Sequence, residues 1–400
     1  MKIREVKLRG FRNISETHFT PEPHLNFIIG KNGQGKTAVL EAISFLSTLR
    51  SFRGAKNDEV LQYQNPWSEV ACRLEDEDWT TEIKVTFAKQ ENERVLKTAF
   101  VDGKAYKSSS HFLSTRYGQK ELGFHSIVFN PSDHDLVRGE PALRRQYLDR
   151  VISAEDGSYL KTLSRYQKVV EQRNTLLKQN LSMTRTPEWS RAFDEQLVEL
   201  GAQIGLQRLE WIQRLQIRLN NTAHKISPTQ PDLSVFYVSS WMPKIQGISL
   251  ENRDFNTPQI GGHFTGQSDP PSLDFLKTSF WNKLQSLAEA EIRAGVTLAG
   301  PHRDDWTLIF AGQPLKGHGS QGEVRSALIA LKLSEIDLFR TKTGYQPVLL
   351  LDDFSSELDR ERRAFLLQYL SETDLQVFVT STEEPPFEGK IFRMHEGQIS

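Results

Sequence analysis

The stretch that decides the fold lies at residues 30–37 and reads Gly30-Lys31-Asn32-Gly33-Gln34-Gly35-Lys36-Thr37. A short apolar run at 25–29 precedes it, and a segment with helical periodicity and no internal Gly or Pro follows at 38–49. A glycine-rich loop between a strand and a helix lets backbone N–H groups turn inward around phosphates, near the positive end of the helix. The segment therefore predicts a nucleotide-binding loop.

Four side chains near this loop or far downstream of it carry the predicted chemistry. Lys36 is expected to reach the β- and γ-phosphates of ATP, and Thr37 to ligate Mg²⁺. Asp352 follows the apolar run 348–351, where a carboxylate at the end of a buried strand can hold Mg²⁺ through its water shell. Asp353 is then placed to orient or deprotonate the attacking water. The sequence thus predicts ATP and Mg²⁺ as cofactors.

A second candidate phosphate site precedes the predicted helix 324–339 and reads Ser320-Gln321-Gly322-Glu323. A hydroxyl, backbone N–H groups and a helix dipole converge there, which suits a γ-phosphate. On spacing alone, a plain helix N-cap is an open alternative. The position ahead of the Asp352 strand favours the phosphate role. If this tip completes the loop's site in a second molecule, the arrangement predicts an ATP-driven dimer.

Bulk composition is that of an ordinary globular protein, with 400 residues, 38% of them hydrophobic and 25% charged. The net charge of −1 argues against coating nucleic acid by bulk attraction, so DNA contacts must come from local basic patches. The single cysteine, Cys72, permits no internal disulfide, and no stretch approaches membrane-spanning length. These features predict a cytoplasmic protein with no membrane partner.

Periodicity divides the chain into three parts. Alternating apolar residues at 3–8 and 70–101 predict strands of an antiparallel sheet beside the nucleotide core. Apolar spacings of three and four at 142–219, and a further helix at 273–293, predict a helical lobe, with an irregular connection at 227–271 that holds one strand at 233–238. From residue 298 the pattern returns to nucleotide-core character. We therefore expect an ATPase lobe at 1–130 and 296–400, interrupted by a mainly helical lobe at 131–295.

Beyond these patterns, the chain resembles the RecF recombination mediators, within the wider group of ABC-type ATPases that includes SMC and Rad50 proteins. The match covers essentially the whole chain. Besides the loop at Gly30 and the Ser320 tip, it rests on Phe11-Arg12-Asn13, Phe129-Asn130-Pro131-Ser132-Asp133, Arg144-Arg145-Gln146-Tyr147-Leu148-Asp149, Gly300-Pro301-His302-Arg303-Asp304-Asp305 and the run from Asp352 to Asp359.

The resemblance implies an α/β fold: an ABC-type P-loop ATPase head with an adjoining antiparallel sheet, plus a second, mainly helical lobe. It also implies a homodimer with ATP between one copy's loop and the other's Ser320 and Gly322, and with Asp359 at the seam. A weak DNA-dependent ATPase would clamp DNA at single-strand gaps and duplex junctions, and would help load the recombinase with RecO and RecR. Hydrolysis would then release the clamp.

Three departures from the family pattern stand out. Glu323 replaces the usual glutamine, Phe354-Ser355 interrupts the usual spelling before Glu357, and Thr380-Ser381-Thr382 lacks the switch histidine of ABC transporters. Asp353 occupies the catalytic acid position, which is glutamate in most ABC ATPases but aspartate in this family. Because aspartate is one methylene shorter, we expect looser positioning of water and slow turnover.

DNA-contacting residues are harder to predict, because basic and acidic residues alternate. Candidates for a phosphate-facing patch are Arg144, Arg145, Arg150, Lys161, Arg165 and Lys168, with an ordinary solvated surface as the alternative. The contiguous run 302–305 resembles a metal cluster, but four successive side chains cannot all face one ion. A structural or nucleotide-relay role is the preferred interpretation.

Three other functions compete with the DNA clamp. A P-loop kinase would need an acceptor pocket and has no use for a Ser320 tip acting on a second molecule. A nuclease would need another acidic cluster, and none has a usable spacing outside the ATPase motifs. A transporter subunit conflicts with the inserted helical lobe and the absent switch histidine.

Overall fold

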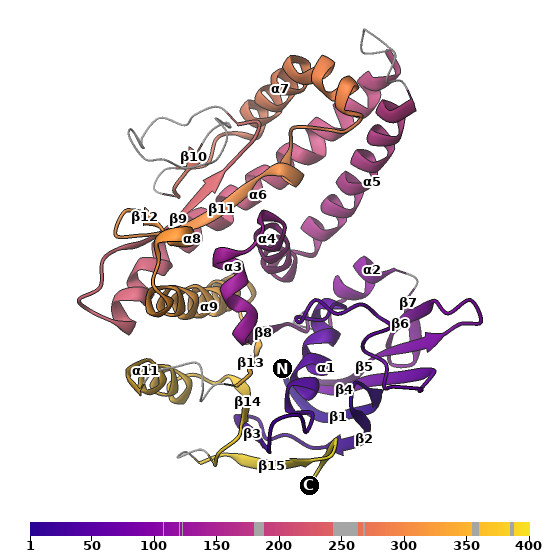
Figure 1. The fold of residues 1–400 in the computed structure, drawn as a ribbon, viewed down its shortest axis with the longest axis vertical. Coiled ribbons are helices and arrows are strands. Elements are labelled where there is room, and N and C mark those ends of the chain that lie inside the picture. The colour runs from indigo at the N-terminus through magenta and orange to yellow at the C-terminus, as the bar shows by residue number, and fades with distance from the viewer. Residues whose placement is uncertain are drawn as a thin grey trace. The chain divides into compact units, whose positions relative to one another are not determined.

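The computed structural model describes residues 1–106, 108–119, 121, 123–179, 188–242, 263–266, 269–353, 360–384 and 388–400. The chain forms two compact units (Figure 1). The first joins Met1–Asp133 to Glu335–Ser400, and the second is His134–Ser334. Both ends of the chain therefore contribute to one unit.

A six-stranded sheet forms the nucleotide core of the first unit, in the order β16-β15-β3-β14-β13-β8. All neighbours are parallel except the edge pair β15 and β16. All four residues of β13 are buried, as is typical of a strand covered on both faces. The strands are β3 (Leu25–Ile29), β8 (Ser126–Phe129), β13 (Val348–Leu351), β14 (Gln376–Ser381), β15 (Lys390–His395) and β16 (Gln398–Ile399).

The predicted antiparallel sheet is present beside this core, in the order β2-β1-β4-β5-β6-β7. Helix α1 (Lys36–Thr48) contacts strands of both sheets, which explains why every residue from Ala38 to Leu46 is buried. Phe45 of α1 packs edge-on against Phe87, with 5.0 Å between the ring centroids. The strands are β1 (Lys2–Phe11), β2 (Ile14–Phe19), β4 (Trp67–Asp76), β5 (Trp79–Lys89), β6 (Val95–Val101) and β7 (Lys104–Tyr106).

Helices dominate the second unit, in which α5 lies along α6 (Figure 1). Its helices are α3 (His134–Arg138), α4 (Pro141–Glu155), α5 (Gly157–Gln179), α6 (Glu188–Ile226), α7 (Leu273–Ala294) and the short α8 (Leu315–His318). Helix α9 (Gln321–Thr343) begins in this unit and ends in the first, where η1 (Pro131–Asp133), α2 (Ser109–Leu113) and α11 (Arg360–Ser371) also lie. Along the described parts of the chain, no helix combines the length and apolar character needed to cross a membrane.

The boundaries of the helical unit differ from the expected 131–295. Residues 296–334 belong to this unit because β11 (Asp305–Phe310) pairs with β9 (Leu233–Val238) along its whole length. The resulting four-stranded antiparallel sheet has the order β10-β9-β11-β12, with β10 (His263–Phe264) and β12 (Gln313–Pro314) at its edges. The turn η2 (Pro301–Arg303) leads into β11. The Ser320 tip thus belongs to a different unit from the phosphate loop.

Candidate nucleotide-binding site

Backbone geometry requires glycine at two positions of the phosphate loop, which joins β3 to α1. Gly35 precedes the first residue of α1 with φ of 112°, a region that side-chain-bearing residues rarely adopt. A Cβ atom there would lie 2.7 Å from Met394 Cε, and one at Gly30 would lie 2.4 Å from the Met394 carbonyl oxygen. The backbone of β15 thus leaves no room for a side chain at Gly30, and at Gly35 the positive φ is the main reason for glycine.

Lys36 sits at the first position of α1 and closes over its own loop. Its Nζ donates hydrogen bonds to the carbonyl oxygens of Gly30 at 2.6 Å and Lys31 at 2.9 Å. Burial lowers the pKa of the Lys36 ammonium, and the charges of Asp353 and Asp352 oppose this shift. The two carboxylates thus favour the charged form that binding a polyphosphate requires.

Asp352 accepts hydrogen bonds from two threonines at a single oxygen. Thr37 Oγ1 and Thr380 Oγ1 each donate to Asp352 Oδ1 over 2.9 Å. Burial raises the pKa of Asp352, and the two hydrogen bonds only partly oppose it. A buried carboxylate beside a threonine hydroxyl offers hard oxygen ligands and negative charge in need of a cation, which fits Mg²⁺. The residues predicted to bind the metal are therefore adjacent in the fold.

A cavity of about 350 Å³ is lined by part of the predicted phosphate loop and by the predicted metal and catalytic residues. Its lining consists of Arg12, Asn13, Asn32, Gly33, Gly35, Lys36, Thr37, Ala38, Arg53, Asp352, Asp353 and Thr380. Its volume falls in the range of small-molecule sites. Gly30, Lys31 and Gln34 of the predicted set do not line it. Gln34 instead accepts a hydrogen bond from the Gly397 backbone at 3.0 Å, which ties the loop to the C-terminal hairpin.

Sequence reasoning missed Thr380, whose hydroxyl also accepts a hydrogen bond from the Asp353 backbone N–H at 2.8 Å. The sequence pattern indicates a strand over 376–380, but only the pairing of β14 with β13 in the structure places Thr380 beside Asp352. Asn13 was missed as a loop contact, although its side chain donates to the Gly33 carbonyl at 3.0 Å.

Arg12 follows the last residue of β1 directly. It lines the cavity, and its guanidinium forms a two-point pair with Glu41, whose side chain is fully buried. The distances are 3.0 Å from Nε to Oε2 and 2.6 Å from Nη2 to Oε1. Arg12 thus links the lining of the cavity to the buried face of α1.

The Ser320 tip has the geometry of a capping box. The Ser320 backbone N–H donates to Glu323 Oε2 at 2.7 Å, and the Glu323 backbone N–H donates to Ser320 Oγ at 3.3 Å. Ser320 and Gln321 are exposed, while Gly322 is half-buried. The plain helix N-cap, which was the open alternative for this tip, is therefore formed in this structure, and Ser320 remains exposed. Asp359 and the rest of the run 354–359 lie outside the described residues.

One expectation about DNA contacts is wrong: Arg144 is buried and binds Asp305 through two hydrogen bonds of 2.7 and 2.8 Å. Arg145 is half-buried and donates to the Asp304 carbonyl at 2.9 Å, and Arg150 packs over the Tyr147 ring. These residues were candidates for a basic patch, whereas α4 directs Arg144 and Arg145 toward β11 and its flanking turn. Lys161, Arg165 and Lys168 are exposed.

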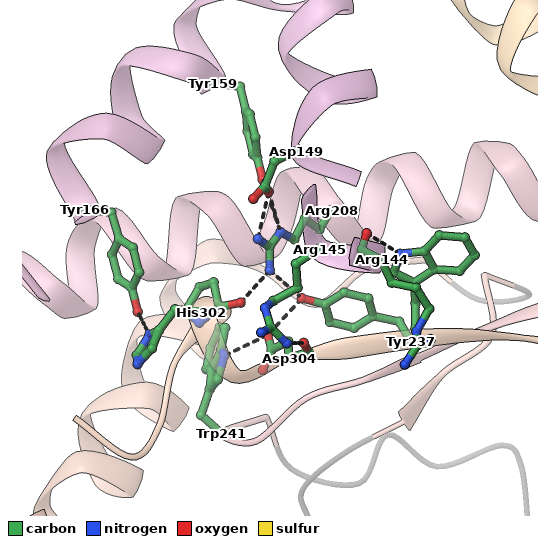
Figure 2. A network of polar contacts seen from close by, with 12 residues as sticks. Arg144, Arg145, Asp149, Tyr159, Tyr166, Arg208, Tyr237, Trp241, His302 and Asp304 are labelled. Carbon is green, nitrogen blue, oxygen red and sulfur yellow. Dashed lines mark hydrogen bonds and ion pairs between the residues drawn. The ribbon is translucent and has the colours of Figure 1, made fainter. Parts of the chain in front are cut away.

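Within the run 302–305, His302 and Asp304 face different partners (Figure 2). Burial lowers the pKa of His302 to about 4, and its neutral Nδ1 is bonded to the Tyr166 hydroxyl at 2.7 Å. The Asp304 carboxylate accepts bonds from Tyr237, Ser240 and Trp241. These partners support the structural interpretation over a metal site. Among the residues that the structure describes, no cluster of three or more His, Cys, Asp or Glu could hold a metal ion.

Together, the phosphate loop, the paired Thr37 and Asp352 after a parallel strand, and a serine-led helix tip define an ATPase head of the ABC class. A family model described as the RecF/RecN/SMC N-terminal domain matches residues 2–394. The chain belongs to the RecF family within this group. It is 34% identical to the DNA replication and repair protein RecF of Geotalea daltonii over 96% of this chain and 93% of that protein. It is also 33% identical to the RecF of Geotalea uraniireducens over the full length of both.

Solved structures agree with this assignment. A structure described as the recombination mediator protein RecF-ATP in the RecFOR pathway superposes with a TM-score of 0.83 at 29% identity, covering 100% of this chain and 97% of that one. An Smc head domain of Pyrococcus furiosus, bound to the C-terminal domain of ScpA, gives 0.52 at 14% identity over 100% of this chain and 95% of that one, which shows a common fold alone.

Proposed function

We propose that this protein is an ATP-dependent DNA-binding protein of recombinational repair, in which ATP joins two copies around DNA. The observation that carries the proposal is the division of the ATP site. Lys36, Thr37 and Asp352, which we propose to bind phosphate and Mg²⁺, line one cavity of the first unit, and an exposed serine-led helix tip lies at the start of α9 in the second. The relatives, which are described as a DNA replication and repair protein and as an ATP-bound recombination mediator, support the same role.

In the proposed mechanism, the loop and Lys36 bind the phosphates, and Thr37 with Asp352 would hold Mg²⁺. The metal would neutralise the negative charge on the phosphates. Asp353 orients or deprotonates the attacking water, and its backbone is fixed by Thr380. Ser320 and the N–H groups of α9 bind the γ-phosphate held by the other copy, with Asp359 at the seam. Loss of that phosphate removes the link between the two copies and opens the clamp.

DNA would contact the exposed face of α5. Lys161, Arg165 and Lys168 stand three and four residues apart, so they share one side of the helix. Among the described residues, none of the three has a hydrogen-bond or ion-pair partner. The unit that carries them has 24 Lys and Arg against 21 Asp and Glu, a net charge of +3, whereas the first unit has 26 against 30, or −4. Unpaired cations on the more basic unit are suited to phosphate contacts.

The pathway role is also a proposal. We propose that the clamp recognises single-strand gaps and duplex junctions, that DNA stimulates its weak ATPase activity, and that it assists recombinase loading together with RecO and RecR. The support is the RecFOR pathway named for the structural relative.

The decisive experiment measures mass and DNA affinity in one series with ATP, ADP and no nucleotide, all with Mg²⁺. Light scattering should show a dimer with ATP alone, and duplex DNA should bind more tightly in the same sample. Charge reversal at Lys161, Arg165 and Lys168 should abolish DNA binding while leaving the ATP-dependent dimer intact. A monomer in saturating ATP, with DNA affinity indifferent to the nucleotide, would exclude the clamp.

A further inference from the structure

Two backbone turns of the second unit are held together by reciprocal side-chain hydrogen bonds. One turn, at residues 138–140, joins α3 to α4, and the other, at 315–319, leads directly into the Ser320 tip. Arg138 Nη2 donates to the Gly319 carbonyl oxygen at 2.8 Å, and Lys316 Nζ donates to the Gly139 carbonyl oxygen at 3.2 Å. Each turn therefore supplies one cation and one acceptor to the other.

The turn that precedes the tip has little regular structure of its own. Lys316 and Gly317 are non-helical within α8, and Gly317 has φ of 95°. Glycine-containing segments have many alternative conformations, so fixing one of them costs conformational entropy. Within the turn, the Gly319 N–H donates to the Leu315 carbonyl at 3.1 Å. The Arg138 and Lys316 hydrogen bonds restrain this turn further, because they link it to the turn at 138–140.

The partner turn at 138–140 rests on a buried support. Arg144 Nη1 donates to the same Gly139 carbonyl at 2.8 Å while its other nitrogens bind Asp305. Trp306 Nε1 in turn donates to the Arg144 carbonyl at 2.8 Å. Arg145, which Figure 2 shows beside Asp304, holds the carbonyl of that residue. Contacts between Arg144-Arg145 and Asp304-Asp305 thus hold the turn at 138–140 in place, and this turn in turn binds the one at 315–319.

We propose that Arg138 is a positioning residue for the γ-phosphate contact. Arg138 holds the Gly319 carbonyl and thereby fixes the residue before Ser320. The position of Gly319 in turn sets the direction of the Ser320 hydroxyl and of the first N–H groups of α9. Arg138 is exposed, so in the proposed dimer its guanidinium would also add positive charge near the other copy's triphosphate. This inference rests on the proposed ATP-linked dimer and adds the element that orients its second half.

The test compares dimerisation with nucleotide binding in the full chain, using a slowly hydrolysed ATP analogue and Mg²⁺. Arg138→Ala should weaken dimerisation, measured by sedimentation, at least tenfold, because a charge-assisted hydrogen bond is lost from both tips of the dimer. Binding of a fluorescent ATP analogue to the monomer at high dilution should stay within twofold, because the phosphate loop lies in the other unit. Arg138→Lys keeps a donor and should restore most of the dimerisation.

Two further variants separate this role from a general effect of surface charge. Lys316→Ala should weaken dimerisation in the same direction, and its effect should not add fully to that of Arg138→Ala, because both hold one turn. Arg191→Ala removes an exposed arginine of the same unit, which pairs with Glu195 at 3.1 Å, and should change nothing.

The outcomes distinguish this inference from the function on which it rests. A wild type that stays monomeric with the analogue overturns both. A wild type that dimerises no better than Arg138→Ala overturns the positioning role alone, as does an Arg138→Ala variant whose monomer loses nucleotide affinity in proportion to its dimerisation. Arg138→Gln provides a second variant if the alanine variant is poorly folded.

Discussion

Thr37 Oγ1 lies 2.9 Å from Asp352 Oδ1 and donates a hydrogen bond to it, although 315 positions separate the two residues in the sequence. Thr380 donates to the same carboxylate oxygen from a third segment. The contact forms because β3 and β13 both pair with β14 in the parallel sheet, so their carboxyl ends meet at one edge. A buried carboxylate is thereby held beside the phosphate loop.

Asp352→Asn should stabilise the nucleotide-free protein and abolish Mg²⁺-dependent ATP hydrolysis. The asparagine oxygen can accept both threonine bonds without the cost of burying a charge, so we expect the free energy of unfolding to rise by about 1 kcal/mol. Denaturant unfolding and steady-state hydrolysis check the two parts. A variant that is less stable than wild type without nucleotide would contradict this explanation of the raised pKa.

The same residue predicts a pH dependence of stability. Because burial raises the pKa of Asp352 in the folded state, the folded protein holds this proton more tightly than the unfolded chain does. Its contribution to stability should therefore fall as the pH rises from the unfolded value of 3.8 through the folded pKa. Unfolding of wild type and Asp352→Asn across that window should show a difference that grows with pH, and a constant difference would argue against it.

Lys36→Ala should lower ATP affinity by about a hundredfold, because charge-assisted bonds to two phosphates are lost. Dimerisation and ATP-dependent DNA binding should be lost together with it. Lys31→Ala is the matched control: Lys31 is exposed in the same loop and offers Lys36 only its backbone carbonyl. Calorimetric titration of both variants measures the effect. Nucleotide-stimulated dimers of Lys36→Ala would contradict the assigned role.

The phosphate loop and Asp352 could be predicted because their chemistry depends on local sequence. A glycine loop between a strand and a helix, and acids directly after an apolar strand, need only their neighbours in the chain to be recognised. The long helices and the antiparallel sheet could be predicted for the same reason, since their periodicity is local.

Long-range pairing could not be predicted in this way. The residues from 298 on were assigned to the nucleotide core, and nothing in the sequence of β11 states that its partner is β9. Arginine is a residue type that usually lies at the protein surface. Only the fold shows that Arg144 is buried and paired with Asp305. Thr380 lies at the end of an expected strand, and only the strand order places it beside Asp352.

Asp353→Asn should bind ATP and accumulate as a persistent dimer on DNA, with hydrolysis slowed about a hundredfold because the variant cannot accept a proton. Asn tolerates the left-handed backbone of this position, where φ is 49°, so the fold should be unaffected. DNA dissociation after a chase with competitor measures the release step. Dissociation as fast as that of wild type would show that Asp353 is not required for release.

Asp353→Glu tests why this position holds an aspartate. Glutamate reaches one methylene further but is disfavoured in a left-handed conformation, so we expect an altered turnover rate and a small loss of stability. An unchanged steady-state rate would discard the idea that the shorter side chain limits turnover.

Arg12→Ala should destabilise the first unit by about 3 kcal/mol, because it leaves the buried Glu41 carboxylate without its two-point partner. Ser51 and the more distant Arg53, at 3.9 Å, remain to offset part of the loss.

Adding Glu41→Gln to Arg12→Ala should recover most of the stability, since an amide needs no counter-charge. Arg4→Ala removes an exposed pair with Glu75 and should cost less than about 1 kcal/mol. Denaturant unfolding of wild type, the two single variants and the double variant measures these free energies. Equal losses of unfolding free energy in Arg12→Ala and Arg4→Ala would show that the burial of Glu41 does not determine how much its pair with Arg12 stabilises the protein.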